Sequence, residues 1–186
     1  MALTKTPICE FGKKAINFNL RSTENKFITL NDIKGEKGTL VMFICNHCPY
    51  VKAVIKDITE DTKKLKKIGI NSVAIMSNDT QNYKEDSFEN MKIFANENSF
   101  IFPYLIDETQ EIAKKYNAVC TPDFFGYNSN LELQYRGRIR EHKNLKPVGK
   151  NEESDLFKAM KLIEKTKKGP DNQIPSMGCN IKWFNN

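Results

Sequence analysis

Hydrophobic positions along the chain follow two different spacings, and these spacings divide the sequence into predicted strands and helices. Alternating apolar residues over 15–20 and 27–30 predict a β-hairpin. The nearly continuous apolar run Thr39–Ile44 predicts a strand that is covered on both faces, as in a parallel sheet. After Pro49 the apolar positions recur at helical spacing, which predicts a helix that ends at Gly69.

The same patterns continue to the last quarter of the chain. They predict a strand over 72–76, a helix over 87–98, a strand over 102–106, a helix over 109–116, a hairpin from 124–127 and 131–136, and a helix over 152–167. A βαβ crossover followed by an antiparallel hairpin and a last helix forms a mixed central sheet with helices on both faces. The predicted fold class is therefore α/β.

The chain of 186 residues predicts a single domain over 1–186, because single cores typically occupy ~100–200 residues. Residues 1–38 form a predicted β extension before this core, which contains the first hairpin. The only long loop candidate is 137–151. The tail over 170–186 is polar apart from four residues, so it is either frayed or docked by those side chains: Met177, Ile181, Trp183 and Phe184.

The formal charge of +6 comes mostly from Lys residues scattered along the whole sequence, and we expect no nucleic-acid partner. The densest basic stretch is Arg136–Arg140 with His142 and Lys143, which is either a solvated loop or a stripe that contacts phosphate. No run approaches the ~20 apolar residues of a membrane span, and the first residues lack the apolar core of a signal peptide. We therefore expect a cytoplasmic protein without a membrane partner.

Five cysteines in a chain without an export signal favour redox or metal chemistry over a disulfide scaffold. Cys45 and Cys48 lie three residues apart where the strand of Thr39–Ile44 meets the next helix. In the first turn of a helix they would be within disulfide reach, and the free N–H groups and dipole would stabilise a thiolate. We assign Cys45, at the exposed turn, as the nucleophile and Cys48 as the resolving thiol.

His47 lies between the two cysteines. As an imidazolium it would favour the thiolate and so make the couple more oxidising; alternatively it is a solvated residue without redox effect. A zinc site would need a second cysteine or histidine pair, whereas His142 is the only other histidine. We therefore expect dithiol chemistry with no metal and no cofactor.

Two segments resemble the thioredoxin-like superfamily: Cys45-Asn46-His47-Cys48-Pro49-Tyr50 after an apolar strand, and Val119-Cys120-Thr121-Pro122 before a later one. The N-terminal hairpin with 102–108 and 135–139 resembles the branch of alkyl hydroperoxide reductase and thiol-specific antioxidant proteins, and 176–183 is similar to the ending of small bacterial members. The resemblance implies a thioredoxin-like fold over nearly the whole chain. It also implies a cis Thr121–Pro122 bond beside the cysteines, with the Thr121 backbone free to bind a peptide.

The sequence departs from the resembled families at two points. Peroxiredoxins carry a Pro-x-x-x-Thr-x-x-Cys box, but counting back from Cys48 places Cys45 at the Thr position and Val41 at the Pro position. Thioredoxins carry Trp before the first cysteine and a buried acid in the preceding strand, whereas this chain has Ile44 and only the apolar run 40–43 there. The proton donor for Cys48 is therefore unassigned, and peroxide reduction is the alternative rather than the main prediction.

The other cysteines leave alternatives open. Cys120 is either a small buried hydrophobic residue or a third thiol near the site, and Cys9 is expected to be inert. Cys179 is either an inert terminal thiol or a partner for Cys120 or the main pair. The predicted function is thiol-disulfide exchange with a protein or small-molecule disulfide and an unidentified redox partner. The alternatives are a thiol peroxidase and a metal-binding, copper-chaperone-like protein using Cys45, His47 and Cys48.

Overall fold

The computed structural model describes residues 3–149 and 152–184, so predictions for 1–2, 150–151 and 185–186 lie outside the described residues. The elements are β1 (Leu3–Lys5), β2 (Asn19–Ser22), β3 (Phe27–Thr29), α1 (Leu30–Ile33), β4 (Gly38–Phe43), α2 (Pro49–Lys67), β5 (Ile70–Met76), a 3₁₀ turn η1 (Lys84–Asp86), α3 (Phe88–Glu97), β6 (Tyr104–Ile106), α4 (Glu111–Tyr116), β7 (Cys120–Thr121), β8 (Asp123–Asn128), β9 (Leu133–Tyr135), β10 (His142–Lys143), β11 (Lys146–Pro147), α5 (Asp155–Thr166) and β12 (Met177–Asn180). None of the helices in the described ranges is both long and apolar enough to cross a membrane.

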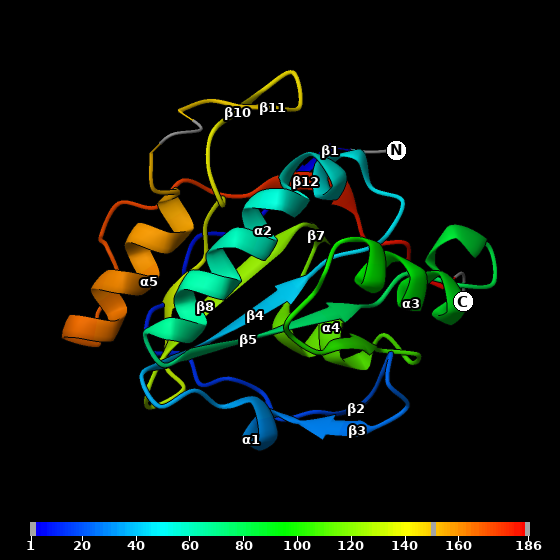
Figure 1. Ribbon diagram of the computed structural model, residues 1–186, viewed down its shortest axis with the longest axis horizontal. Helices are drawn as coiled ribbons and strands as arrows, with labels where there is room; N and C mark the ends of the chain where they lie inside the picture. Colours follow the sequence, from blue (N-terminus) through cyan, green and yellow to red (C-terminus); the bar gives the residue numbers. More distant parts are fainter. Residues whose placement is uncertain (1–2, 150–151, 185–186) are drawn as a thin grey trace.

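The main sheet has seven strands in the order β3-β2-β6-β5-β4-β8-β9. β4, β5 and β6 are parallel, whereas β8 runs antiparallel to β4 and β9 antiparallel to β8 (Figure 1). β2 also pairs with β6, so the N-terminal hairpin extends the main sheet at one edge. The predicted mixed α/β sheet flanked by helices is confirmed.

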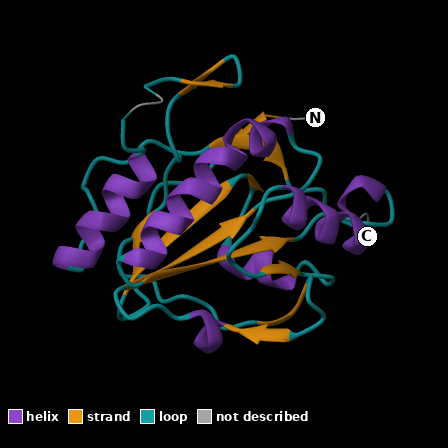
Figure 2. Cartoon of the chain, in the orientation of Figure 1, coloured by secondary structure: helices purple, strands orange, loops and turns teal. Residues whose placement is uncertain are grey.

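Side chains of β4 alternate between two hydrophobic cores, as the two-residue period of a strand requires. Leu40 and Met42 pack on one face with buried side chains of α2, α3 and α5. Val41 and Phe43 pack on the other face with side chains of α1 and α4. Helices thus cover both faces of the sheet (Figure 2), which explains the continuous apolar run in the sequence of β4.

The structure decides between the two alternatives for the tail and changes the predicted loop. The tail is docked, because β12 lies between β1 and β7 in a separate three-stranded sheet. Ile181 is buried, whereas Met177 and Trp183 are more than one third exposed, so backbone pairing anchors the tail more than its large side chains do. The predicted loop over 137–151 contains the small β10–β11 hairpin.

Candidate active site

The Cys-x-x-Cys segment lies at the carboxyl end of β4, in the middle of the sheet. The strand pairing continues one residue beyond β4, since the Ile44 amide donates to the Ile75 carbonyl (3.1 Å). The chain then bends through Asn46 and His47, and Cys48 is the N-cap of α2. The prediction that both cysteines lie within the first helical turn was therefore wrong: Cys45 precedes the helix, because Pro49 is its first residue.

Both sulfur atoms contact Thr121, which precedes a cis peptide bond to Pro122, as the resemblance implied. The Cys48 thiol donates to the Thr121 carbonyl (3.1 Å), and the Cys45 sulfur lies 3.3 Å from the Thr121 hydroxyl. The structure thus brings four predicted site residues together. It also corrects the exposure expected of Cys45, whose side chain is only 1% exposed.

Asp86 holds the bend between the cysteines in place, and the sequence analysis did not identify it. One carboxylate oxygen accepts hydrogen bonds from the amides of Asn46 (2.8 Å) and His47 (3.3 Å). The other lies 2.6 Å from His47 Nδ1 and accepts from the Asn78 side chain (2.7 Å). Asp86 is fully buried at the end of η1. Its position depends on long-range contacts, and no local motif marks it.

The charge of His47 is balanced by Asp86, which changes the role predicted for the imidazole. The hydrogen bond to Asp86 raises the pKa of His47, while the bond to His47 helps to lower the pKa of Asp86 against the effect of burial. The His47 ring also stacks on Tyr83, with 5.7 Å between the ring centres. His47 is therefore a partly buried member of an ion pair, and the interpretation as a solvated residue was wrong.

The two thiols of the motif have opposite acidities. The Cys45 thiol is the main cause that lowers the pKa of Cys48 to about 5, and the Cys179 thiol and the amides of Val51 and Cys179 add to it. The pKa of Cys45 is well above its ordinary value because its proton is held by Cys48, and because it is buried near the Asp86 carboxylate. The two cysteines therefore titrate as a coupled pair whose first proton leaves more easily than that of an ordinary thiol. Cys48 is the more acidic sulfur, opposite to the prediction from the sequence, and as a thiolate it gives up its hydrogen bond to the Thr121 carbonyl.

The remaining cysteines differ in their surroundings. Cys120 is buried, its sulfur lies 3.8 Å from the Pro122 carbonyl oxygen, and burial raises its pKa. Burial also raises the pKa of Cys9 to about 11. Cys179 is 3% exposed and lies opposite Thr121 in the β7–β12 pair. Of these three, Cys179 alone is among the main groups that lower the pKa of Cys48.

A metal ion would have to compete with existing hydrogen bonds. Ligand atoms of Cys45, His47 and Asp86 all lie within 4.8 Å of one another. However, each Asp86 oxygen already has two partners, and His47 Nδ1 is one of them. This arrangement suits a carboxylate that positions the bend better than one that ligates a metal.

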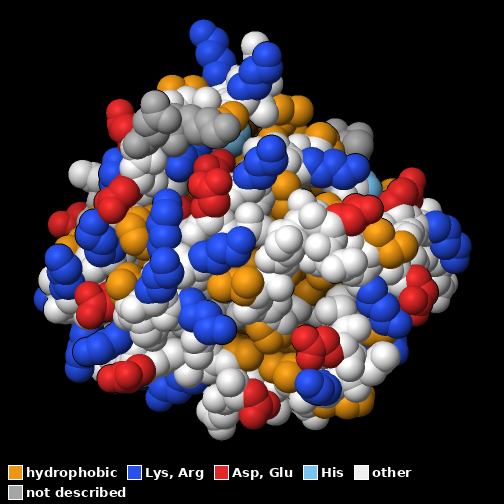
Figure 3. Space-filling view, viewed as in Figure 1, with side chains coloured by type: hydrophobic (Ala, Val, Ile, Leu, Met, Phe, Trp, Pro, Cys, Tyr) orange, Lys and Arg blue, Asp and Glu red, His pale blue; other side chains and the backbone are white. Residues whose placement is uncertain are grey.

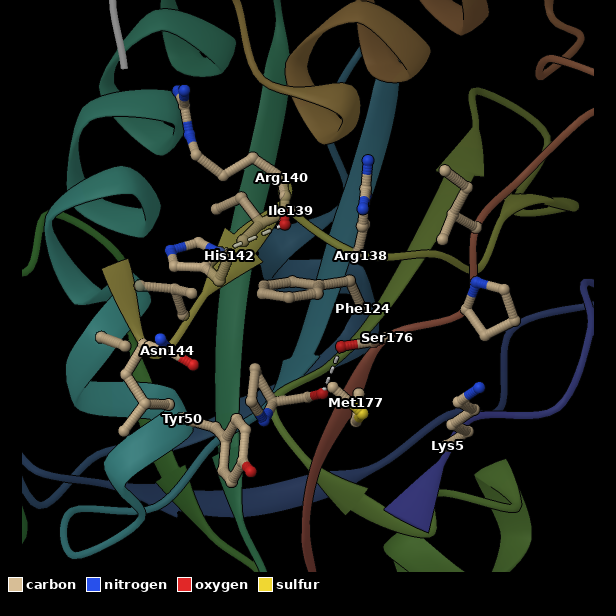
Figure 4. A pocket seen from close by; sticks show the side chains of 16 residues that line it. Lys5, Tyr50, Phe124, Arg138, Ile139, Arg140, His142, Asn144, Ser176 and Met177 are labelled. Atoms are coloured by element: carbon tan, nitrogen blue, oxygen red, sulfur yellow. Dashed lines mark hydrogen bonds between the residues drawn. The ribbon is translucent and has the colours of Figure 1, made fainter. Parts of the chain in front are cut away.

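A cavity of about 410 Å³ lies on the Pro122 side of the dithiol. Figure 4 shows the Phe124 ring at its centre, with Tyr50 from the first turn of α2 and Met177 from β12 towards one end. The Ser176 hydroxyl donates to the Pro122 carbonyl (2.8 Å) and ties the tail to this rim. The cavity therefore offers mainly apolar surface next to the cis peptide.

The basic stretch beyond β9 is neutralised by acidic side chains. Buried Arg136 pairs with Asp123 at 2.8 Å, Arg138 with Asp155 at 2.7 Å, and Arg140 with Asp57 at 2.9 Å. Figure 3 shows Lys and Arg interspersed with Asp and Glu over the visible face. Neither earlier interpretation of these arginines was right, because Arg136 is paired inside the sheet with Asp123 of β8, while Arg138 and Arg140 hold the loop to α5 and α2.

Comparisons with known proteins agree with this geometry. The thiol-disulfide oxidoreductase ResA of Bacillus thuringiensis subsp. konkukian is 30% identical over 122 residues, which is 66% of this chain and 66% of that protein, just under two thirds of its length. An uncharacterised conserved protein from Geobacillus kaustophilus is similar in structure, with a TM-score of 0.92, 38% identity, and coverage of 99% of this chain and 97% of that one.

A third protein supports the fold alone. A thiol:disulfide interchange protein of the thioredoxin family from Chlorobium tepidum TLS has a TM-score of 0.63 at 18% identity, over 82% of this chain and 97% of that one. The predicted thioredoxin-like fold is therefore confirmed. The AhpC/TSA family model matches residues 11–142, which span the extended sheet, the dithiol and the cis-proline. The chain belongs to the AhpC/TSA family.

Proposed function

We propose that the protein is a thiol-disulfide oxidoreductase that cycles between the Cys45–Cys48 dithiol and its disulfide. The observation that carries this proposal is the placement of both sulfurs against Thr121, beside the cis-proline, in a coupled pair whose first proton is acidic. A thiolate is the form that attacks a disulfide, and a neighbouring thiol can then resolve the mixed disulfide. The name of the ResA relative supports the same activity.

The acidities favour an order of attack opposite to the one expected from the sequence. Cys48 attacks a sulfur of the substrate disulfide and forms a mixed disulfide, while the other substrate sulfur leaves as a thiolate. Cys45 then attacks Cys48 and releases the second substrate thiol. The substrate disulfide gains two electrons and the protein dithiol loses them. Substrate access requires movement of the surrounding chain, because both sulfurs are buried.

The reduction of insulin by dithiothreitol tests the proposal. We expect the wild-type protein to accelerate it, and the Cys45→Ser and Cys48→Ser variants to return it to the uncatalysed rate. Cys120→Ser is the matched control: the Cys120 sulfur is directed to the Pro122 carbonyl (3.8 Å), whereas both dithiol sulfurs contact Thr121, so the substitution should leave the rate nearly unchanged. Full activity in either motif variant would contradict the proposed couple.

A thiol peroxidase is the second candidate, and the acidic Cys48 thiol is the observation that favours it. Against it, Cys45 and Val41 occupy the positions of Thr and Pro in the peroxide-binding box. We therefore expect hydrogen peroxide to oxidise Cys48 no faster than a free thiolate, measured by stopped-flow fluorescence. Oxidation several orders of magnitude faster would favour the peroxidase instead.

Protein disulfides are the substrate class that we propose, with the cavity beside Pro122 receiving neighbouring apolar side chains. A second thiol protein would return the couple to its starting state. The cytoplasmic location stays a prediction.

A further inference from the structure

The tail occupies the backbone edge that the resemblance assigned to a bound peptide. β12 pairs antiparallel with β7, with Cys179 opposite Thr121 and Asn180 opposite Cys120 (Figure 1). Peptides commonly bind proteins by adding a strand to such an exposed edge. The expectation that the Thr121 backbone is free for a substrate is therefore wrong in this state, because the chain's own tail is paired there.

The docking places Cys179 at the reactive sulfur. The Cys48 sulfur lies 3.1 Å from the carbonyl oxygen of Thr121, the residue opposite Cys179. Cys179 belongs to the same buried cluster as Cys45 and Cys48, and its thiol and amide help to lower the pKa of Cys48. The strand is fixed on both sides of this point. Ser176 binds Pro122, and the Ile181 amide donates to the Val119 carbonyl (3.2 Å).

We propose that Cys179 is a third redox-active cysteine, which forms a disulfide with Cys48 when β12 is docked on β7. This inference rests on the proposed exchange activity and deepens it, because the tail then acts as a built-in substitute for a substrate strand. Cys48 becomes a shared sulfur that either Cys45 or Cys179 can resolve. The Cys48–Cys179 form keeps the tail covalently closed over the site.

The step balances as an ordinary thiol-disulfide exchange. Cys48 is first joined to one half of a substrate disulfide, and the other half has left as a thiolate. The Cys179 sulfur attacks Cys48, the Cys48–substrate bond breaks, and the leaving substrate sulfur takes up the proton lost by Cys179. The substrate disulfide is reduced to two thiols, while Cys48 and Cys179 are oxidised to one disulfide.

A negative charge on Cys48 keeps the Cys179 thiol protonated for as long as Cys48 is not bonded to a substrate sulfur. Burial, the hydrogen bond to Cys48 and the charge of Cys48 raise the pKa of Cys179 to about 12. The hydrogen bond to Cys48 and the charge of Cys48 both disappear once Cys48 is bonded to a substrate sulfur, so the pKa of Cys179 should then fall. Cys120 lies opposite Asn180 and directs its sulfur to the Pro122 carbonyl (3.8 Å), so it is the weaker candidate.

The Cys45→Ser variant removes the competing thiol, so that Cys179 is the proposed partner that remains for Cys48. We expect oxidised glutathione or diamide to convert it to a form that has lost two thiols and keeps no glutathione. Trypsin separates the cysteines cleanly, since Cys48 lies in peptide 38–52, Cys120 in 116–136 and Cys179 in 169–182. Mass spectrometry without reduction should therefore find 38–52 joined to 169–182, in at least tenfold excess over 38–52 joined to 116–136.

Two controls make the result decisive. The Cys45→Ser/Cys179→Ser variant should keep one glutathione on Cys48, and Cys45→Ser/Cys120→Ser should still form the cross-link. Glutathione retained on Cys48 in the single variant, or Cys179 left free after either oxidant, overturns the role of Cys179. If the wild type forms no Cys45–Cys48 disulfide and does not reduce insulin, the proposed function itself fails.

Discussion

At the scale of single residues, the site is organised by the hydrogen bonds of two residues outside the Cys-x-x-Cys motif. The Asp86 carboxylate accepts hydrogen bonds from the backbone amides of the bend and from the imidazole of His47, whereas Thr121 contacts both sulfurs. The motif contributes the reactive atoms, and these neighbours decide which atom carries the charge. Asp86 disfavours charge on Cys45, while the Cys45 thiol favours it on Cys48.

The Cys45 thiol is therefore expected to control the acidity of Cys48. In Cys45→Ala the donor is lost, so the pKa of Cys48 should rise from about 5 towards the ordinary range of a thiol. Absorbance of the thiolate at 240 nm, followed against pH, measures this shift. In Cys48→Ser the acidic transition should vanish; if it persists there and vanishes in Cys45→Ser, the thiolate belongs to Cys45.

The His47–Asp86 pair predicts a pH dependence of stability with a definite sign. The pKa of His47 is raised above 6.5 in the folded protein, so its contribution is complete below about pH 6.5 and is lost as pH rises through the folded value. The pKa of Asp86 is lowered from 3.8, so its contribution is lost at acidic pH.

We therefore expect His47→Asn to lose most stability between about pH 4.5 and 6.5, and less above the folded pKa of His47. Urea unfolding of both proteins at several pH values measures the difference. His142→Asn is the control, because the nearest acidic oxygen to its ring lies 3.9 Å away. A destabilisation that is independent of pH would mean that only packing and the neutral hydrogen bond matter.

At the scale of elements, local patterns predicted the long helices and buried strands, and missed the short strands made by distant partners. α2 was predicted because its apolar face repeats over 19 residues and Pro49 marks its start. β1 and β12 each have three or four residues and pair across the two ends of the chain, so their sequences carry no comparable period. The same limit hid Asp86, whose partners lie in other elements.

Two elements that the sequence analysis missed, α1 and the β10–β11 turn, carry signals in their local sequence. α1 begins with a capping box in which Thr29 accepts from the Asp32 amide and the Asp32 carboxylate accepts from the Thr29 amide. The β10–β11 turn has Asn144 and Leu145 at positive φ, which Asn tolerates but Leu disfavours, so its sequence gives only half of a turn signal. Cavity, tail pairing and thiol acidity follow from tertiary packing and are not encoded in any such local pattern.

The start of α5 provides a test of one element. The Ser154 side chain accepts from the Phe157 amide (2.9 Å) and donates to the buried Asp61 carboxylate of α2. Ser154→Ala should lower the free energy of unfolding by about 2–3 kcal/mol, since it removes both a cap and a donor to a buried charge. Ser87→Ala removes only the cap of α3, and about 1 kcal/mol is expected. Equal losses in chemical denaturation would contradict the link between α5 and α2.

At the scale of the whole molecule, the two chain ends meet over the active site. β1 pairs with β12, which pairs with β7, and the Lys182 amide beyond β12 donates to the Asn78 side chain, a partner of Asp86. The tail thus contacts both sides of the dithiol. Because Cys48 is buried and β12 lies beside it, we expect a protein disulfide to reach Cys48 when this three-stranded unit opens, so the stability of tail docking should set the rate of exchange.

Gly178 allows the close approach of β12 to β7, and its replacement tests whether tail docking limits access to Cys48. A Cβ at this position would lie 2.0 Å from the Thr121 carbonyl oxygen, which is backbone and cannot yield without moving the strand. Gly178→Ala should therefore weaken tail docking and increase the reaction of Cys48 with a water-soluble aromatic disulfide. An acceleration of about tenfold corresponds to ~1.4 kcal/mol of lost docking free energy. Leu3→Ala is the control, because this exposed side chain of β1 lies in the same three-stranded sheet, is not among the residues lining the cavity, and its replacement leaves the backbone pairing intact. If Gly178→Ala lowers the melting temperature while the reaction rate of Cys48 stays at the wild-type value, the tail is a structural strand that does not gate the site. A faster reaction with little loss of global stability identifies tail opening as the step that exposes the dithiol.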